Sequence, residues 1–351
     1  MAHPWESKWT VGDRLGKGGQ GITHAVSHID DPSIRGALKR LKNNRDSQAR
    51  GRMRGEVANL QRLASAGGSV PRVLTDNAEA FEDLSTELYV VMDLIVGSTI
   101  RAYVEENGTI DIDTAIAIVL ALCKSAAIAH SIPVLHRDLN PENIIFRRED
   151  LTDPVIIDFG LSFNADDKPM SKPNESFRSW FLALPETNTP LGDRRDHRSD
   201  LTALCALLYY CLTGHGVGQL KDESEKLPHF HDGRSLHDSI PNDARIVQVE
   251  AFLTKGLSQN IANRYQDVAE IVGCLTPIVE ASKEIDESDP FQVARALSDE
   301  MRLTDRKIQI AEFTQQAIIL FNFSQQTEFP KYHKGRFANC ATYASTSQNS
   351  P

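Results

Sequence analysis

Short apolar runs alternate with turn residues over the first ninety positions, a pattern that predicts strands and turns with a single helix. Strands are expected at Val70 to Leu74 and at Leu88 to Met92, the second a fully apolar run of the kind that central strands show. The pattern breaks at Gly97-Ser98 and becomes helical beyond it. We therefore expect a boundary at this point.

The helix of the first part is expected at about residues 54–64, before a pair of glycines. Its Glu56, Leu60 and Leu63 lie at i, i+4 and i+7, so a carboxylate is aligned with the apolar face. Burying an unpaired carboxylate is costly. A cation is therefore expected to face Glu56 in the folded protein.

Helical periodicity dominates the second part. Asp111 is expected to cap a helix that Pro133 stops, with an apolar stripe at Ile112, Ala115, Ile116, Val119, Leu120 and Cys123. The longest uncharged run, Leu201 to Leu220, is long enough to span a membrane, but turn residues from Gly214 onward interrupt it. A buried helix that ends near Gly214 is predicted instead, and no membrane span.

The fold class predicted is α+β with two lobes and a partly helical extension. The divisions are a leader (1–9), a small β-rich lobe (10–92), a hinge (93–98), a larger helical lobe (99–281) and an extension of unknown role (282–351). Val293, Leu297 and Met301 give the extension its helical spacing. We expect it to pack on the second lobe, on a partner or on a second copy.

Composition narrows the classes of function. The formal net charge of −10 and the sequence pI near 5.6 argue against a protein that coats nucleic acid or anionic membrane. Five cysteines without paired spacing suggest no disulfide framework, and the N-terminus lacks the apolar core of a signal peptide, so a cytoplasmic location is expected. His229 and His231 could both lie on one face of a strand, but without a cysteine nearby a metal site is disfavoured.

The first candidate chemistry is a glycine-rich stretch, Gly16-Lys17-Gly18-Gly19-Gln20-Gly21, between a strand ending at Leu15 and another containing Thr23. Glycines at these spacings let backbone N–H groups approach phosphate oxygens that a Cβ would exclude, although any glycine-rich hairpin matches. The strand Ala37-Leu38-Lys39 strengthens the signal, because Glu56 is the natural partner of Lys39 and would hold it against nucleotide phosphates.

Two further polar positions follow. An apolar strand, Val155 to Ile157, delivers Asp158 to its end, and the stretch HRDLNPEN at residues 136–143 contains Asp138 and Asn143. Asn143 and Asp158 offer the hard oxygen ligands that Mg²⁺ takes when it also holds phosphates. Asp138 is then left as the group that accepts a hydroxyl proton.

These motifs, in this order and spacing, resemble those of the eukaryotic-type protein kinases. GKGGQG resembles the glycine-rich loop, GALK the nucleotide-lysine strand, HRDLNPEN the catalytic loop, DFG the metal loop, and LPE at 184–186 the end of the activation segment. The match continues through Arg198-Ser199-Asp200 and Asn263-Arg264 and so covers about residues 10–280.

The resemblance implies ATP and Mg²⁺ as cofactors and a role for each matched position. The glycines would cover the phosphates, Lys39 would contact the α- and β-phosphates, and Asp138 would orient the substrate hydroxyl, with Asn143 and Asp158 binding Mg²⁺. The adenine site and hinge would comprise Thr23, Ala37, Met92, the backbone of Asp93 and Ile95, and Ile145. Glu186 would pair with Arg264, and Asp200 would brace the catalytic loop.

Asn140 is the main departure from the family. Ser/Thr kinases that resemble this sequence usually carry a lysine there, which helps to neutralise the γ-phosphate, whereas Asn140 can donate a hydrogen bond but no charge. Lys172 and Arg178 are the candidate compensating cations. A slow enzyme and a nucleotide-binding pseudokinase that acts as a scaffold both stay open.

The activation segment bears on the acceptor. Ser179 stands where Ser/Thr kinases carry a threonine, which favours transfer to Ser/Thr hydroxyls of proteins, itself included, over a small-molecule phosphotransferase of related fold. Arg137 in this family commonly pairs with a phosphate, for which Ser171 and Ser176 are candidate sites. The alternative is that Arg137 pairs with an acidic residue of the segment: Asp166, Asp167 or Glu175.

Overall fold

The computed structural model describes residues 3–17, 21–132, 134–158, 163–164, 180–188, 196–220, 226–240 and 243–281. The chain divides into two compact units, Met1–Ser282 and Lys283–Pro351, and every described residue belongs to the first. The predicted extension therefore lies outside the described residues.

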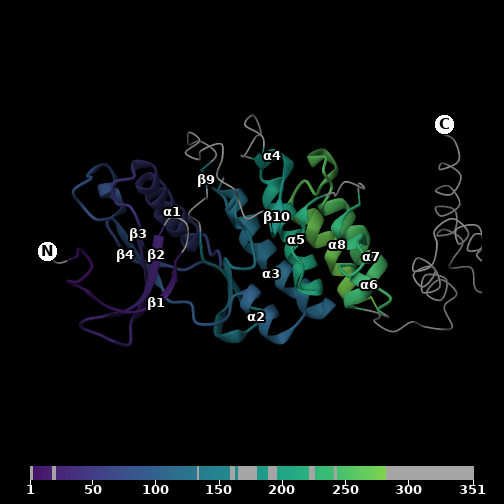
Figure 1. The fold of residues 1–351 in the computed structure, drawn as a ribbon, viewed down its shortest axis with the longest axis horizontal. Coiled ribbons are helices and arrows are strands. Elements are labelled where there is room, and N and C mark those ends of the chain that lie inside the picture. The colour runs from purple at the N-terminus through teal and green to yellow at the C-terminus, as the bar shows by residue number, and fades with distance from the viewer. Residues whose placement is uncertain are drawn as a thin grey trace, which may run out of the picture. The chain divides into compact units, whose positions relative to one another are not determined.

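A five-stranded antiparallel sheet forms the first lobe (Figure 1), in the order β1-β2-β3-β5-β4. Its strands are β1 (Trp9–Lys17), β2 (Gly21–His28), β3 (Arg35–Leu41), β4 (Val73–Asp76) and β5 (Tyr89–Asp93). β5 pairs with β3 and β4, and its first four residues are buried, as predicted for a central strand. The strand predicted at residues 70–74 begins later, at Val73, where pairing with β5 starts, and Val70 is buried in the core ahead of it.

Helix α1 (Ser47–Ser65) starts seven residues before the predicted position, 54. The Asp46 carboxylate accepts hydrogen bonds from the backbone N–H groups of Gln48 and Ala49, which caps the helix at that point. At the other end the N–H of Gly68 donates to the carbonyl of Leu63 at 2.9 Å, a Schellman-type stop that the glycine pair predicted.

The leader belongs to the first lobe. Trp5 and Trp9 are only 2% and 3% exposed, and they pack with Val26, Leu38, Tyr89 and Val91 on one face of the sheet. The alternate residues of β5, Val90 and Met92, join α1 in the main core on the other face. Residues 3–9 therefore cover one face of the sheet, a role the sequence pattern did not reveal.

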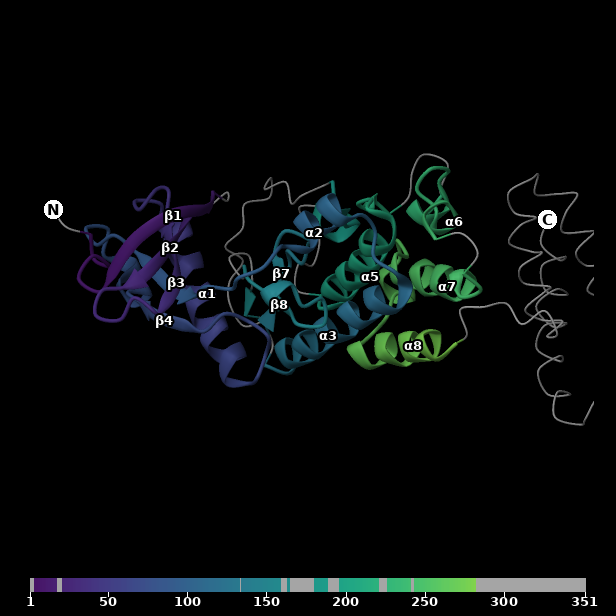
Figure 2. The ribbon, with the colours of Figure 1, turned by 90° about the horizontal axis from the view of Figure 1, so that it is seen from below.

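Helices make up most of the second lobe (Figure 2). They are α2 (Ile100–Asn107), α3 (Ile112–Ser131), α4 (Pro185–Asn188), α5 (Arg198–Thr213), α6 (Leu236–Ser239), α7 (Ile246–Gly256) and α8 (Val268–Glu280). As predicted, the Asp111 side chain caps α3, and α5 is buried and ends at Gly214, which has φ +72°.

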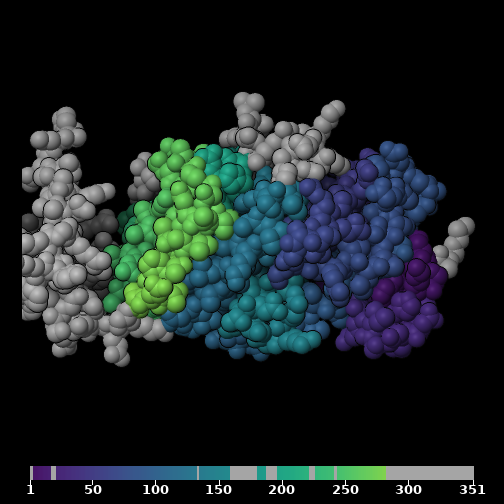
Figure 3. Space-filling view, turned by 180° about the vertical axis from the view of Figure 1, so that it is seen from behind, coloured from purple at the N-terminus to yellow at the C-terminus, as the bar shows by residue number. Residues whose placement is uncertain are grey.

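α3 lies at the centre of this lobe, packed against α5 and α8. Figure 3 shows α8, in yellow-green, covering one side of the lobe. Within the described ranges α3 is also the one helix long and apolar enough to cross a membrane, but more than half of that stretch is buried inside the protein. It is accordingly a core helix.

Short strands and 3₁₀ turns complete the second lobe. The strand pairs are β6 (Val134–Leu135) with β9 (Phe163–Asn164), β7 (Ile144–Phe146) with β8 (Pro154–Ile156), and β10 (Leu182–Ala183) with β11 (Gly218–Gln219). The strand considered for His229 and His231 is not formed, since residues 228–230 make a 3₁₀ turn that packs His229 into the interior. The part of the chain described contains no cluster of three or more metal-binding side chains.

The hinge is joined tightly to β7. The N–H groups of Phe146 and Arg148 donate to the carbonyls of Ser98 and Val96, at 2.9 and 2.6 Å. Gly97 has φ +145°, and a Cβ built on it would lie 1.8 Å from the Phe146 carbonyl oxygen. Only glycine fits this crossing between the lobes.

Candidate active site

Three charged groups from separate elements meet where the lobes join. Lys39 of β3 donates to Glu56 of α1 at 2.6 Å and to Asp158, just beyond β8, at 3.0 Å. The predicted ion pair between Lys39 and Glu56 is therefore present, and Asp158 is a third member that sequence reasoning did not place in contact with it. The Glu56 side chain is 2% exposed, whereas that of Asp158 is 44% exposed.

The carboxylates keep this lysine charged. Burial alone would lower the pKa of Lys39, but the negative charges of Asp158 and Glu56 outweigh burial and raise it. A lysine held charged and oriented by two carboxylates is suited to binding an anion such as a phosphate.

α5 braces the loop that carries Asp138. The Asp200 carboxylate accepts the backbone N–H groups of His136 and Arg137, both at 2.9 Å, as the resemblance implied. Burial would raise the pKa of Asp200, but hydrogen bonds from His130 and from the Arg137 backbone contribute to holding it below its usual value. Arg137 itself has φ +67°, a left-handed conformation that these bonds help to maintain.

Asn143 orients Asp138. Its Nδ2 donates to the Asp138 backbone oxygen at 2.9 Å and to carboxylate Oδ2 at 3.0 Å. With its nitrogen turned toward Asp138, Asn143 offers its oxygen as a ligand. One amide oxygen and the Asp158 carboxylate fit the small protein contribution that Mg²⁺ takes beside phosphates and water.

Asn140 is turned into the loop rather than toward solvent. It is 1% exposed, its Nδ2 donates to the Asp138 backbone oxygen at 2.9 Å, and its Oδ1 accepts the Glu142 N–H at 2.9 Å. Asn140 and Asn143 thus donate to the same carbonyl oxygen. These hydrogen bonds stabilise the conformation of the loop, and the Asn140 side chain is not turned outward to neutralise a phosphate.

Four of the residues predicted to line the adenine site, Ala37, Met92, Asp93 and Ile145, lie in or beside the strand that leads into the hinge or just past it. Ala37 pairs with Met92 across β3 and β5, and Ile145 bridges to Thr99 just past the hinge. The Asp93 side chain accepts from Arg72 Nε at 2.8 Å, and its N–H donates to the Arg72 carbonyl at 2.9 Å, which fixes the start of the hinge.

The glycine-rich stretch is described only at its ends. Gly16 pairs with Thr23, Leu15 is 51% exposed, and Gly21 lies so close to β3 that its Cβ would be 2.8 Å from the Arg40 carbonyl oxygen. Gly18, Gly19 and Gln20 fall outside the described residues, as do Ser171, Ser176 and Ser179 with the candidate cations Lys172 and Arg178.

The predicted pair between Glu186 and Arg264 is present. Arg264, 1% exposed, donates through Nη1 at 2.6 Å and through Nη2 at 3.1 Å to the two carboxylate oxygens of Glu186. Ser199 also donates to Glu186, at 3.0 Å. This bidentate pair fixes α4 to the rest of the helical lobe.

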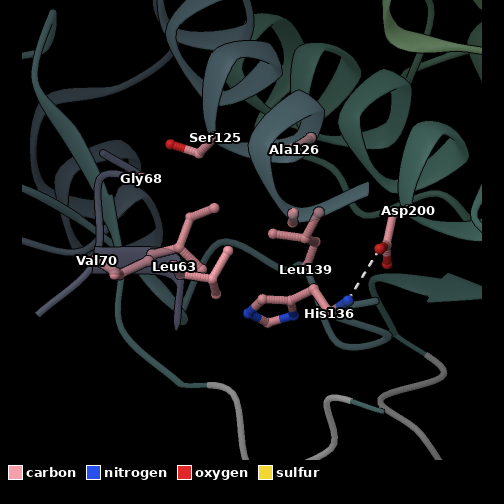
Figure 4. Close-up of a pocket in the computed structure, with 10 residues that line it drawn as sticks. Leu63, Gly68, Val70, Ser125, Ala126, His136, Leu139 and Asp200 are labelled. Atoms are coloured by element: carbon pink, nitrogen blue, oxygen red, sulfur yellow. Dashed lines mark hydrogen bonds between the residues drawn. The ribbon is translucent and has the colours of Figure 1, made fainter. Parts of the chain in front are cut away.

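A small apolar cavity lies beneath the catalytic loop (Figure 4). The residues around it include Leu63 and Val70 from the first lobe, Ala126 of α3, and His136 and Leu139 of the loop. Burial lowers the pKa of His136, which favours the neutral form of its ring. The loop therefore faces the first lobe here with the apolar Leu139 and with an imidazole whose neutral form is favoured.

Fold and site define the class of protein. A five-stranded lobe with a buried lysine–glutamate pair, joined by a hinge to a helical lobe that carries an aspartate–asparagine loop, is a two-lobed kinase fold. The predicted α+β fold with two lobes is confirmed, whereas the partly helical extension lies outside the described residues.

Comparison with known proteins agrees with this kinase fold. Residues 9–272 match the sequence profile of the protein kinase domain, so the chain belongs to the protein kinase family. It is 26% identical over 263 residues to the serine/threonine-protein kinase PknD of Mycobacterium tuberculosis, covering 73% of this chain and 37% of PknD. It is 25% identical over 306 residues to PknE of Mycobacterium bovis, covering 85% of this chain and 48% of PknE. The chain spans less than half the length of these curated relatives.

Proposed function

We propose that this protein transfers the γ-phosphate of MgATP to Ser or Thr hydroxyls of protein substrates, itself included. The observation that carries the proposal is the convergence of Lys39, Glu56 and Asp158 with the Asp138–Asn143 pair at the junction of the lobes. The names of PknD and PknE, both serine/threonine-protein kinases, support the choice of acceptor.

Each side chain has a task in this reaction. Lys39 would bind the α- and β-phosphates, and Asn143 and Asp158 would hold Mg²⁺, which supplies positive charge to the phosphates when bound. Asp138 would accept the hydroxyl proton. Asn143 holds one Asp138 carboxylate oxygen at 3.0 Å and so fixes the orientation of the base.

With Asn140 in place of a lysine, we expect a slow enzyme rather than an inactive one. The residues that would bind nucleotide and orient the acceptor are present, whereas the charge that a lysine would supply at this position is missing. Losing one preorganised group that stabilises the transition state costs about 3 kcal/mol, or roughly a hundredfold in rate.

The test is transfer of labelled phosphate. Purified protein, wild type and Asp138→Ala, is incubated with radiolabelled ATP and Mg²⁺, with protein and small-molecule acceptors, and mass spectrometry locates the phosphate. Label on Ser or Thr that disappears in Asp138→Ala and on removal of Mg²⁺ supports the proposal. ATP binding without transfer would favour a scaffold, and label on small molecules alone would favour the other phosphotransferases.

Location and partners are part of the same proposal. The acidic net charge and the cysteines without paired spacing support a cytoplasmic protein that acts on other proteins rather than on nucleic acid. Residues 282–351 are assigned to contact with a partner or with a second copy. Comparing the masses of full-length and truncated protein in solution tests that assignment.

A further inference from the structure

Arg50 is a fully buried cation that the proposed reaction does not use. It lies in α1 three residues after the helix begins, and its exposure is 0%. A helix start carries the positive end of the helix dipole, so a cation there opposes helix formation, and no acidic residue accompanies it in the first turn. Tertiary contacts must therefore hold Arg50 inside.

A cage of oxygen atoms surrounds its guanidinium group. Four backbone carbonyls of the connection between β4 and β5 accept from it at 2.6 to 2.8 Å, those of Ala80, Phe81, Asp83 and Thr86. Asn44 adds its backbone oxygen at 3.1 Å and its Oδ1 at 2.7 Å. We call these six acceptors the Arg50 cage.

The connection is curled so that these carbonyls point inward. The Asp83 carboxylate accepts from the Ser85 N–H at 2.9 Å and from the Thr86 hydroxyl at 2.5 Å, which forms a tight turn. Asn44 closes the other side, because its Nδ2 donates to the Thr86 carbonyl at 2.8 Å and its Oδ1 accepts the Leu88 N–H at 3.0 Å. The segment is thus shaped around the cation.

The cage fixes α1 to the strand that leads into the hinge. Glu56 follows Arg50 by six residues on the same helix, and the connection continues into β5, which ends at Asp93. A movement of α1 that withdrew Glu56 from Lys39 would strip a buried cation of its hydrogen bonds, which is unfavourable. We propose that Arg50 is a positioning residue that holds α1 where Glu56 pairs with Lys39; the proposal rests on the proposed kinase function.

Three variants test this role. Arg50→Met removes the guanidinium group. Arg50→Lys keeps the charge but lacks the planar guanidinium group that reaches all six acceptors, and Asn44→Ala removes the side-chain acceptor. The matched control is Arg54→Met, because Arg54 contacts the same connection from the surface, 4.6 Å over the Phe81 ring and 3.4 Å from Glu79. Arg54 is 47% exposed.

We expect Arg50→Met and Arg50→Lys to lower kcat about tenfold or more, the size of one lost hydrogen bond to a charged group, while Arg54→Met stays near wild type. Hydrogen exchange across residues 47–65 should quicken in the Arg50 variants, with Asn44→Ala intermediate. If Arg50→Met does not fold, Arg50→Lys and Asn44→Ala carry the same test.

A double-mutant cycle separates positioning from general damage. In a Glu56→Gln background the Arg50 variants should cause little further loss of kcat, because the pair they support is already absent. A full, additive loss in that background would overturn the positioning role. So would unchanged exchange in the Arg50 variants, a readout that remains decisive even if wild type transfers no phosphate and the proposed function fails.

Discussion

Asn140 stabilises the loop through its hydrogen bonds but supplies no positive charge toward the phosphate. Asn140→Ala should remove the hydrogen bonds that the Asn140 side chain makes with the Glu142 N–H and with the Asp138 carbonyl, at a cost of about 2 kcal/mol in the free energy of unfolding and a lower kcat. Asn140→Lys should lower the melting temperature as well, yet raise kcat, because a lysine supplies charge toward the phosphate. Thermal unfolding and labelled-phosphate transfer, measured on both variants, check the opposite signs. Equal or slower transfer by Asn140→Lys would show that the missing charge is not limiting.

Gly97 lies where the hinge backbone crosses that of Phe146 at the end of β7. Gly97→Ala places a methyl group on the Phe146 carbonyl oxygen and imposes a strained φ, so it should cost about 3 kcal/mol or more and weaken ATP binding. The control is Gly55→Ala in α1, where a Cβ meets nothing within 4 Å, and a gain of about 1 kcal/mol is expected from helix propensity. Thermal unfolding and nucleotide titration measure both. Unimpaired ATP binding by folded Gly97→Ala would contradict this view of the hinge.

The buried His229 should make the stability of the fold sensitive to acid. Burial lowers its pKa from 6.5 to about 4, so the folded state favours the neutral ring. The unfolded chain therefore binds more protons between these values, and stability is lost as pH falls from about 6.5 toward 4, by on the order of 3 kcal/mol. His229→Gln should flatten denaturant-measured stability over that window, although His136, whose pKa burial also lowers, leaves part of the slope. An unchanged slope would disprove the role of His229.

At the scale of elements, the leader contributes more to the packing of the first lobe than the sequence pattern indicated. Trp5→Ala should destabilise the protein by about 3 kcal/mol, because a buried indole ring is removed from one face of the sheet. Val11→Ala, an exposed residue of β1 on the same sheet, should cost about 0.5 kcal/mol or less. Denaturant unfolding compares the two. A similar small loss for Trp5→Ala would mean that the leader adds little to the lobe.

Element boundaries followed local signals where those were strong. Asp111 before an apolar stripe and Gly214 after one located the ends of α3 and α5, because a cap and a left-handed stop act through neighbouring backbone groups. The start of α1 was misplaced because its first two turns, residues 47–53, contain Arg50 and Arg52 and show no apolar stripe. The Arg50 cage that stabilises them is a tertiary feature.

At the scale of the whole molecule, the first unit accounts for the family match. Residues 9–272 carry that match, and Met1–Ser282 forms its own compact unit. Truncation after residue 282 should therefore leave the melting temperature and basal phosphate transfer close to those of the full chain. Calorimetry and the transfer assay on both forms measure this. A large fall in melting temperature would show that residues 283–351 contribute to the stability of the first unit.

The sequence by itself determined the family, the two-lobed fold and the residue types of the site. Kinase chemistry requires particular groups at particular spacings along the chain, and these spacings can be recognised from the sequence alone. It also predicted the pairs of Lys39 with Glu56 and of Glu186 with Arg264. Only the tertiary structure decided that Asn140 turns inward, that Trp5 covers the sheet and that carbonyls enclose Arg50. Each of these depends on burial and on contacts between distant segments, which periodicity does not encode.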